Sequence, residues 1–346
     1  AQDATPSKTF IDYFLPMPVN GGLSKDAWGS SLTGPRDQRN GLEDSTMKKW
    51  NYWDGGIIKG PDGKYHLFAS RWEQGAGFGA WSGSRAVHAV SGNLFGPYVD
   101  KGMCWPDNEG GRGHNVSSLV LPDGRYAIVV SETRPGDVFV ATSLDGPWTH
   151  LGKIQVADGP HKNLGAMSNV RPMVRPDGKF EIIARSGAIW ISNGSILGPY
   201  VIQDTSIYPK IPTLKGYHDL EDPMLWHSGG LYHIIVNSWG SRKTFHLTSP
   251  DGISGWQDRG LAIDPTANFI RYTDGTVNHW ANLERASVYL ENGHVVAVTL
   301  AATDYSKNEI PGNSGHGSKI LVLPFNGAAL DKDEAAIPSP ATHSSP

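Results

Sequence analysis

The chain has 346 residues, among them 42 Gly, 24 Pro, 12 Trp and 1 Cys, and its formal net charge is −4. With a pI near 6.4 it has no basic field for nucleic acid, and its apolar runs are too short to span a membrane, so we expect neither partner. The single cysteine excludes an intrachain disulfide and a zinc–thiolate cluster, while the Gly and Pro excess favours short strands joined by tight turns.

Residues 1–46 precede any repeated pattern and are predicted to form an N-terminal extension. Within it, the apolar segment 10–15 (FIDYFL) is expected to act as a closing strand. The chain begins Ala-Gln-Asp-Ala-Thr, and glycosylation sequons start at Asn115 and Asn193. From these features we expect a secreted, extracellular protein.

A β-hairpin signature recurs through most of the chain. Each copy consists of an apolar run, a tight turn such as Pro-Asp-Gly, and a second run rich in apolar or aromatic residues. A further strand and a Ser/Gly turn ending in an aromatic residue follow the first four copies, as in SGNLFGPY and SLDGPW, whereas the fifth is followed only by SKILVLPF. The five hairpins span residues 56–68, 118–130, 172–183, 223–235 and 286–298.

Tandem four-stranded antiparallel units are typical of propeller blades. We therefore predict an all-β fold, a five-bladed β-propeller closed with help from the N-terminal segment, with a β-sandwich as the alternative. The propeller is expected to span residues 47–330 as one catalytic domain. The tail, residues 331–346, is predicted to be disordered because it ends in Ser, Pro, Thr and Ala.

Residues just before each hairpin's first strand should meet at one face, because the first strand of every blade lines the central channel. These segments are rich in carboxylates, His, Trp and Arg, a composition that suits an oligosaccharide site. They are residues 50–55, 112–116, 166–171, 217–223 and 278–285.

Two carboxylates that flank a glycosidic bond can cleave it, one as acid and the other as base. The predicted catalytic residues are Asp54 as base, Glu221 as acid, His279 as an alternative acid, and Glu284. Aromatic faces stack on sugars and Arg binds hydroxyls or carboxylates, so a further set is predicted to bind substrate. This set comprises Trp53, Arg71, His88, His114, Arg171, Arg185, His218, Asp222, Trp280 and Arg285.

Each catalytic candidate also has a structural interpretation. Asp54 can cap backbone amides, Asp222 can form a turn before proline, and Glu284 can form an ion pair with Arg285. Several histidines also fall at blade starts or on third strands, which leaves a divalent metal on the propeller axis as an alternative, although no His-Glu-x-x-His spacing supports it. We expect no required cofactor.

Three segments carry a resemblance to a known family. WDGGIIKGPDGKYHLFAS resembles the first blade of the five-bladed propeller glycoside hydrolases of families 43 and 117, which implies that Asp54 is the general base. LEDPMLWHSGGLYHII is similar to the family 43 segment whose Glu, shortly before a Pro, is the general acid, here Glu221. NLERASVYLENGHVVAV resembles the family 117 segment with Glu-Arg before the strand, which points to Glu284 and His279.

One position departs from that family pattern. Family 43 members carry in the third blade an Asp that tunes the acid, whereas this chain has Ser168 and Asn169 there. Either Asp222 replaces that Asp or the mechanism differs.

The leading hypothesis is a secreted, exo-acting glycoside hydrolase that trims side chains of plant or microbial polysaccharides. The alternative is a propeller polysaccharide lyase that cleaves beside a uronic acid by β-elimination, using His88, His114, Arg171, Arg185 and Tyr217. A non-catalytic carbohydrate-binding propeller is the second alternative. The sequence predicts no particular sugar, linkage or oligomeric state.

Overall fold

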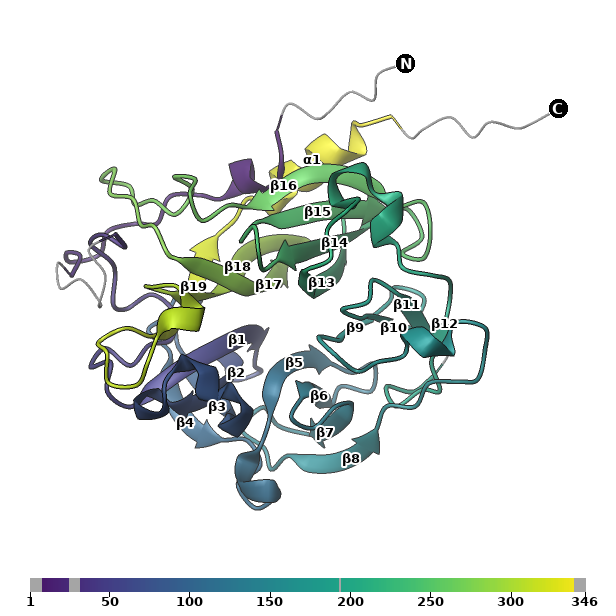
Figure 1. Cartoon of the computed structure of the whole chain (residues 1–346), viewed down its shortest axis with the longest axis horizontal. Helices are drawn as coiled ribbons and strands as arrows, with labels where there is room; N and C mark the ends of the chain where they lie inside the picture. Colours follow the sequence, from purple (N-terminus) through teal and green to yellow (C-terminus); the bar gives the residue numbers. More distant parts are fainter. Residues whose placement is uncertain (1–7, 25–31, 193, 339–346) are drawn as a thin grey trace.

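Five antiparallel sheets surround a central axis in the computed structural model, which describes residues 8–24, 32–192 and 194–338 (Figure 1). Four of the described sheets have four strands and the fifth has three. The prediction of an all-β, five-bladed β-propeller is confirmed. No helix within the described ranges is long and apolar enough to cross a membrane.

The blades follow one another along the chain, and in each sheet the strands pair in sequence order. The strands are β1 (Trp50–Lys59), β2 (Tyr65–Glu73), β3 (Arg85–Ser91) and β4 (Val99–Met103) in blade one; β5 (His114–Val120), β6 (Tyr126–Glu132), β7 (Asp137–Ala141) and β8 (Thr149–Lys153) in blade two; β9 (Arg171–Val174), β10 (Phe180–Ile183), β11 (Ile189–Ser192) and β12 (Val201–Ile202) in blade three; β13 (Leu220–Ser228), β14 (Leu231–Ser238), β15 (Thr244–Ser249) and β16 (Gln257–Ile263) in blade four; and β17 (Asn282–Glu291), β18 (His294–Thr303) and β19 (Ser318–Pro324) in blade five.

The Pro-Asp-Gly turns set the register of the first three hairpins. Gly63, Gly124 and Gly178 each have a positive φ, between 76° and 86°, which glycine adopts without steric cost. The strand ends that meet across the first turn are Lys59 and Tyr65. These turns therefore fix which side chains of the inner hairpin face the next blade.

Apolar clusters fill the spaces between neighbouring blades. Val129 of β6 packs in one cluster with Ile182 of β10 and Trp190 of β11, and Leu67 of β2 packs in another with Val322 of β19. Both faces of the inner strands are thus covered, which explains their nearly continuous apolar runs.

The N-terminal segment helps to close the ring, but the strand expected over residues 10–15 does not form. Phe10–Tyr13 is a short 3₁₀ helix, and Phe14 makes a single antiparallel bridge to Phe325, beyond the end of β19. A second bridge joins Leu42 to Ile320 of β19. The edge of blade five is therefore covered at separate points, with Phe10 buried against the aromatic ring of Phe325.

The predicted disordered tail begins too early. Helix α1 (Gly327–Ala335) packs against the propeller, and its N-terminus is capped by the Asn326 side chain, which accepts a hydrogen bond from the Ala329 amide. Asp331, inside the predicted tail, is buried and accepts a 2.9 Å hydrogen bond from Ser228 of β13. The Ser/Pro-rich composition starts only after this helix, and residues 339–346 lie outside the described residues.

Candidate active site

One residue near the start of each innermost strand has a left-handed backbone. A shift in strand register accompanies it in the first, fourth and fifth blades. Asn and Asp adopt this conformation more readily than other non-glycine residues, because their short side chains can bond to the local backbone. The five residues and their φ angles are Asp54 (74°), Asn115 (53°), Asn169 (46°), Asp222 (52°) and Arg285 (51°).

The left-handed residue interrupts the alternation of side chains along the strand. Two successive side chains can then face the same side, and Glu221 and Asp222 do line one cavity. This local geometry brings polar groups from all five blades together around the axis.

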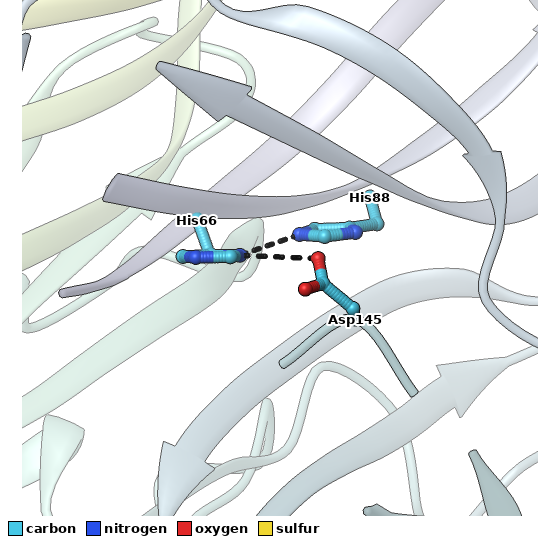
Figure 2. A group of neighbouring side chains, drawn as sticks. All are labelled: His66, His88 and Asp145. Carbon is cyan, nitrogen blue, oxygen red and sulfur yellow. Dashed lines mark hydrogen bonds and ion pairs between the residues drawn. The ribbon is translucent and has the colours of Figure 1, made fainter. Parts of the chain in front are cut away.

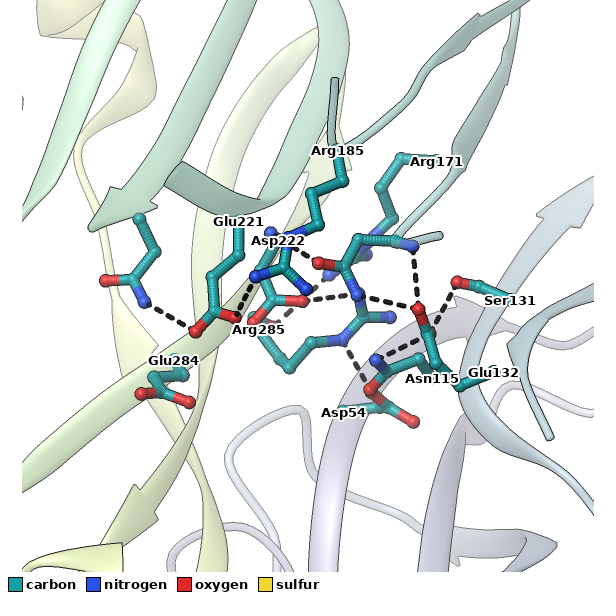
Figure 3. A network of polar contacts seen from close by, with 12 residues as sticks. Asp54, Asn115, Ser131, Glu132, Arg171, Arg185, Glu221, Asp222, Glu284 and Arg285 are labelled. Atoms are coloured by element: carbon teal, nitrogen blue, oxygen red, sulfur yellow. Dashed lines mark hydrogen bonds and ion pairs between the residues drawn. The ribbon is translucent and has the colours of Figure 1, made fainter. Parts of the chain in front are cut away.

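The guanidinium of Arg285 joins blades one, four and five near the axis (Figure 3). Its Nε donates to Asp54 Oδ1 at 2.7 Å and its Nη1 donates to Asp222 Oδ1 at 3.0 Å. The other oxygen of Asp54 accepts hydrogen bonds from the Ser70 hydroxyl and the Val116 amide. Burial acts to raise the pKa of Asp54, but the Arg285 charge and these hydrogen bonds outweigh it and hold that pKa below its usual value.

Arg171 lies beside this network without reaching the cavity. Its Nη2 donates to the Ala286 carbonyl at 3.0 Å. Burial, followed by the charge of Arg285, lowers the pKa of Arg171 to about 9. Arg171 therefore ties blade three to the start of β17.

A cavity of about 640 Å³ opens above the network. One part of its wall is aromatic, formed by Trp53, Trp72, Phe78 and Trp81. Another part is polar and includes His114, Asn115, Glu132, Asn169, Arg185, Glu221, Asp222, Glu284 and Lys307. Flat aromatic faces beside hydrogen-bonding groups suit a sugar, which has both apolar C–H faces and hydroxyl edges.

Of the carboxyl groups that line the cavity, Glu221 is the one whose surroundings most clearly favour the protonated form. Its side chain is 13% exposed, and its oxygens lie 3.7 Å from both Arg185 and Lys307. Burial, then the nearby charges of Asp222 and Glu284, raises the pKa of Glu221 to about 8. Glu221 is consequently protonated at neutral pH and able to donate that proton.

Glu284 and Lys307 form the adjacent ion pair. Lys307 Nζ lies 2.6 Å from Glu284 Oε2, while Glu284 Oε1 has no hydrogen-bond partner among the described residues. Burial raises the pKa of Glu284, although Lys307 opposes that effect. Lys307 therefore pairs with both Glu221 and Glu284.

Glu132, at the end of β6, is a cavity residue that the sequence reasoning missed. Its two oxygens accept five hydrogen bonds, from the side chains of Asn115, Ser131, Ser168 and Asn169 and from the backbone amide of Asn169. Figure 3 shows Glu132 on the opposite side of the Arg285 guanidinium from Glu221. Glu132 and Glu221 thus line the same cavity, and Glu132 is held in place by its donors.

A simple signal was available for Glu132. Second strands run antiparallel to first strands, so the end of a second strand lies at the same face as the start of a first strand. Ser70, Glu132 and Asn237 lie at or near such ends, whereas the predicted site draws on the first-strand starts. Lys307 lies in the short 3₁₀ helix Lys307–Glu309 after β18, a loop position with no periodic signal.

The structure brings only part of the predicted site together. Asp54, Arg171 and Arg285 lie beneath the cavity and do not line it. The predicted residues that line it are Trp53, His114, Arg185, Glu221, Asp222 and Glu284.

Four other predicted residues lie elsewhere. Arg71 pairs with Asp100 at 2.6 Å, and the His279 ring lies 2.8 Å from the Asn268 amide oxygen. Trp280 is buried in the apolar cluster between blades four and five, and His218 lines a second cavity.

His88 belongs to a buried pair away from the cavity (Figure 2). Its Nε2 lies 2.8 Å from His66 Nδ1, with Asp145 of the next blade nearby. Burial, then the His66 ring, lowers the pKa of His88 to about 4. His233 and His246 form the same arrangement in blade four, at 2.9 Å, which indicates a structural role for both pairs.

The predicted glycosylation site at Asn115 is not accessible. Its side chain is buried and its Nδ2 donates to Glu132 at 2.8 Å. Asn193 lies outside the described residues.

Among the described residues, the histidines do not gather on the axis, where the metal alternative had placed them. Arg285 supplies the positive charge between Asp54 and Asp222. Glu221, Asp222 and Glu284 each offer an oxygen within 4.8 Å of the others, but Lys307 already pairs with two of them. A divalent metal on the axis stays a prediction that a measurement of metal content would test.

Solved structures with a similar fold support the fold described above, whereas the sequence comparisons found no match. No protein-family sequence model matches this chain, and no curated protein matches it significantly in sequence. The family 117 glycoside hydrolase Zg3597 from the marine bacterium Zobellia galactanivorans is 15% identical, with a TM-score of 0.54 over 83% of this chain and 88% of that one.

Two family 43 structures are similar to the same degree. CoXyl43, a β-xylosidase/α-arabinofuranosidase from a compost microbial metagenome, is 15% identical, with a TM-score of 0.54 over 80% of this chain and 92% of that one. The exo-β-1,3-galactanase 1,3Gal43A from Clostridium thermocellum is 14% identical, with a TM-score of 0.54 over 86% of this chain and 63% of that one. The chain thus has the five-bladed propeller fold found in glycoside hydrolases of families 43 and 117.

Proposed function

We propose that the protein is an exo-acting glycoside hydrolase in which Glu221 is the general acid and Glu132 the general base. The observation that carries the proposal is a carboxyl with a raised pKa and a separately anchored carboxylate in one aromatic-walled cavity. Hydrolysis of a glycosidic bond needs this division of roles, since one group must donate a proton and the other must accept one.

The acid role follows from the environment of Glu221. At neutral pH the proton stays on Glu221 because burial, Asp222 and Glu284 all disfavour its charge. As the bond to the leaving oxygen breaks, Glu221 transfers that proton to the oxygen and becomes charged. Lys307 and Arg185, both 3.7 Å away, then stabilise the new carboxylate.

We assign the base role to Glu132 because Asp54 is buried beneath the cavity. Asp54 is 1% exposed and does not line the cavity, and its oxygens bond to Arg285, Ser70 and Val116 beneath it. A group in that position holds Arg285 in place but does not reach a water in the cavity. Glu132 lines the cavity, and its five donors hold the carboxylate in place there.

Asp222 and Glu284 provide the negative charge that raises the pKa of the acid, a role for which the third blade has no Asp. The third blade carries Asn169 where family 43 enzymes have an Asp, and Asn169 bonds to Glu132 instead. After burial, the largest influences that raise the pKa of Glu221 come from Asp222 and Glu284. This arrangement supports the hypothesis that Asp222 replaces the missing Asp, with Glu284 assisting.

The cavity is consistent with action at chain ends. Its volume of about 640 Å³ lies within the roughly 300–1,000 Å³ of small-molecule sites and thus fits a few sugar units. We infer that the substrates are side chains of plant or microbial polysaccharides and that the protein is secreted to reach them.

The lyase alternative receives less support. Of its five predicted residues, only His114 and Arg185 line the main cavity, while His88 is paired with His66 elsewhere. Burial lowers the pKa of His114 to about 4, yet its ring is held between the Ser84 hydroxyl and the Trp81 ring. Arg185 can neutralise a uronate, but His114, the other predicted residue in the main cavity, is held by these two contacts.

Digestion of a panel of plant and microbial glycans, read by mass spectrometry, tests the proposal. A hydrolase adds one water for each bond it cleaves, whereas a lyase releases an unsaturated product without water. We expect release of single sugars or short units with water added. Unsaturated products would favour the lyase, and binding without any product would favour the non-catalytic alternative.

A further inference from the structure

A second cavity of about 520 Å³ lies next to the first. Its wall comes from the segments around β9, β10 and β13 and includes Ser168, Arg185, Tyr208, Leu214, Tyr217 and His218. Arg185 lines both cavities, so they adjoin at its side chain. A chain of sugars bound in the first cavity can therefore continue into the second.

Two tyrosines, Tyr208 and Tyr217, line the second cavity. Tyr208 is 6% exposed, lines the cavity, and its hydroxyl has no hydrogen-bond partner among the described residues. Because this hydroxyl has almost no accessible surface, Tyr208 contributes to the wall of the cavity without offering its hydroxyl to a ligand. Tyr217 adds a partly exposed aromatic ring, 36% exposed, that lies 5.4 Å from the Phe245 ring.

Arg185 supplies a positive charge at the junction of the cavities. Its side chain is 44% exposed, and its one ion pair among the described residues is with Glu221, at 3.7 Å. When Glu221 is protonated, as the acid role requires, that ion pair no longer has a negative member. The Arg185 guanidinium is then available to a substrate anion, for which its planar, two-pronged geometry is well suited.

We propose that the second cavity binds the leaving-group sugar and that this sugar carries an anionic substituent, a carboxylate or a sulfate, held by Arg185. This inference rests on the proposed function and adds the class of substrate: an acidic oligosaccharide cleaved next to its charged unit. The substrate anion would also offset the effect of Arg185 on its neighbour, because Arg185 otherwise acts to lower the pKa of Glu221. An acidic substrate would thus help to keep the acid protonated.

Binding calorimetry on the Glu221→Gln variant tests the charge. This variant imitates the protonated acid and leaves the ligand uncleaved. The probes are uronate-containing and sulfated tetrasaccharides, each compared with its carboxyl-reduced or desulfated counterpart. We expect one acidic series to bind about tenfold more tightly than its neutral counterpart, and which series does so identifies the anion.

Adding Arg185→Gln should remove this preference, whereas Arg125→Gln should preserve it. Arg125 is a matched control, since its side chain is 42% exposed and also pairs with a single acid, Asp123. Equal binding of acidic and neutral probes, or a preference that survives Arg185→Gln, would overturn the inference. These binding measurements need no turnover, so they remain decisive even if the proposed hydrolysis is absent.

The Tyr217→Leu variant tests the cavity itself, because it removes the partly exposed aromatic ring that lines it. For wild-type Glu221 enzyme we expect a loss of about fivefold in kcat/KM on tetrasaccharides and no change on an aryl glycoside of the same terminal sugar. An equal loss on both substrates, or on neither, would contradict a leaving-group site. Hydrolysis of the aryl glycoside without these differences would leave the proposed function intact and overturn only this inference.

Discussion

Glu221 is the residue on which the proposed chemistry depends. Three influences act in the same direction on its proton, namely burial, Asp222 and Glu284, while Lys307 and Arg185 act against them. The balance leaves a carboxyl that is neutral at pH 7 but lies beside two cations that can stabilise its anion. A general acid needs both properties, because it must hold a proton before the reaction and release it during the reaction.

Replacing Glu221 with Gln removes the transferable proton and keeps the size of the side chain. We expect kcat on substrates with poor leaving groups to fall about 10²–10⁴-fold, the range typical of a lost general acid. Steady-state kinetics would measure the loss, with Glu73→Gln, an exposed change outside the cavity, as the control. Retention of full activity in Glu221→Gln would exclude this acid.

The pH dependence follows from the same group. An acid with a pKa of about 8 is protonated below that pH, so kcat/KM should decline as the pH rises through about 8. Glu284→Gln removes one negative charge that raises the pKa of Glu221, so the decline should move to lower pH. A pH profile of both proteins measures this, and an unmoved or upward-shifted decline in Glu284→Gln would contradict the coupling.

The sequence predicted Glu221, Asp222 and Glu284 because they directly precede apolar strands at equivalent places in the repeat. The sequence could not show that Asp54, unlike these three residues, lies buried beneath the cavity, because that burial depends on the position of Arg285. Glu132 was missed because it ends a second strand, although antiparallel pairing places that end at the same face.

At the scale of elements, the innermost strands share a left-handed residue that turns polar side chains toward the axis. Arg285 is the exception among these Asn and Asp residues, and it is fully buried between Asp54 and Asp222. Buried charges are tolerated only when they are paired, so this ion-pair network links blades one, four and five.

Arg285→Met should leave two buried carboxylates without a cation. We expect a loss of about 3–5 kcal/mol in the free energy of unfolding, measured by urea denaturation. Arg125→Met, which breaks an exposed pair with Asp123, is the control and should cost no more than about 1 kcal/mol. A similar small loss for both variants would show that the axial pairs do not stabilise the ring.

Helix α1 closes the end of the chain against blades four and five. Leu330 is buried in the cluster that also holds Phe10 and Phe325, so Leu330→Ala should cost about 2–5 kcal/mol. Lys332→Ala, on the exposed side of α1, should change stability little. Thermal unfolding of the two variants would show equal midpoints if α1 were only loosely attached.

Hairpins could be predicted from sequence better than the terminal elements. Asp-Gly and Asn-Gly between apolar runs demand a turn, whereas the six-residue run 10–15 is equally compatible with a strand or a buried helical turn. Helix α1 is short, and its burial depends on contacts with β13 and β18 that no local pattern reveals.

At the scale of the whole molecule, the repeated blades made the fold predictable from sequence, whereas the proposed chemistry depends on a few side chains. The propeller was predictable because five similar units can bury their faces only against one another. The cavity was not, because its walls combine strand starts, strand ends and the loop that carries Lys307. Fold likeness at 15% identity or less therefore leaves the activity to be measured.

The most direct measurement is the anomeric configuration of the product released from a glycan or aryl glycoside, followed by NMR in wild type, Glu221→Gln and Glu132→Gln. A base that activates water on the side opposite the acid gives inversion. We predict inverted product from the wild type and a loss of at least about 10²-fold in each variant. Retained configuration, or full activity in either variant, would contradict the assignment of Glu221 and Glu132 as acid and base.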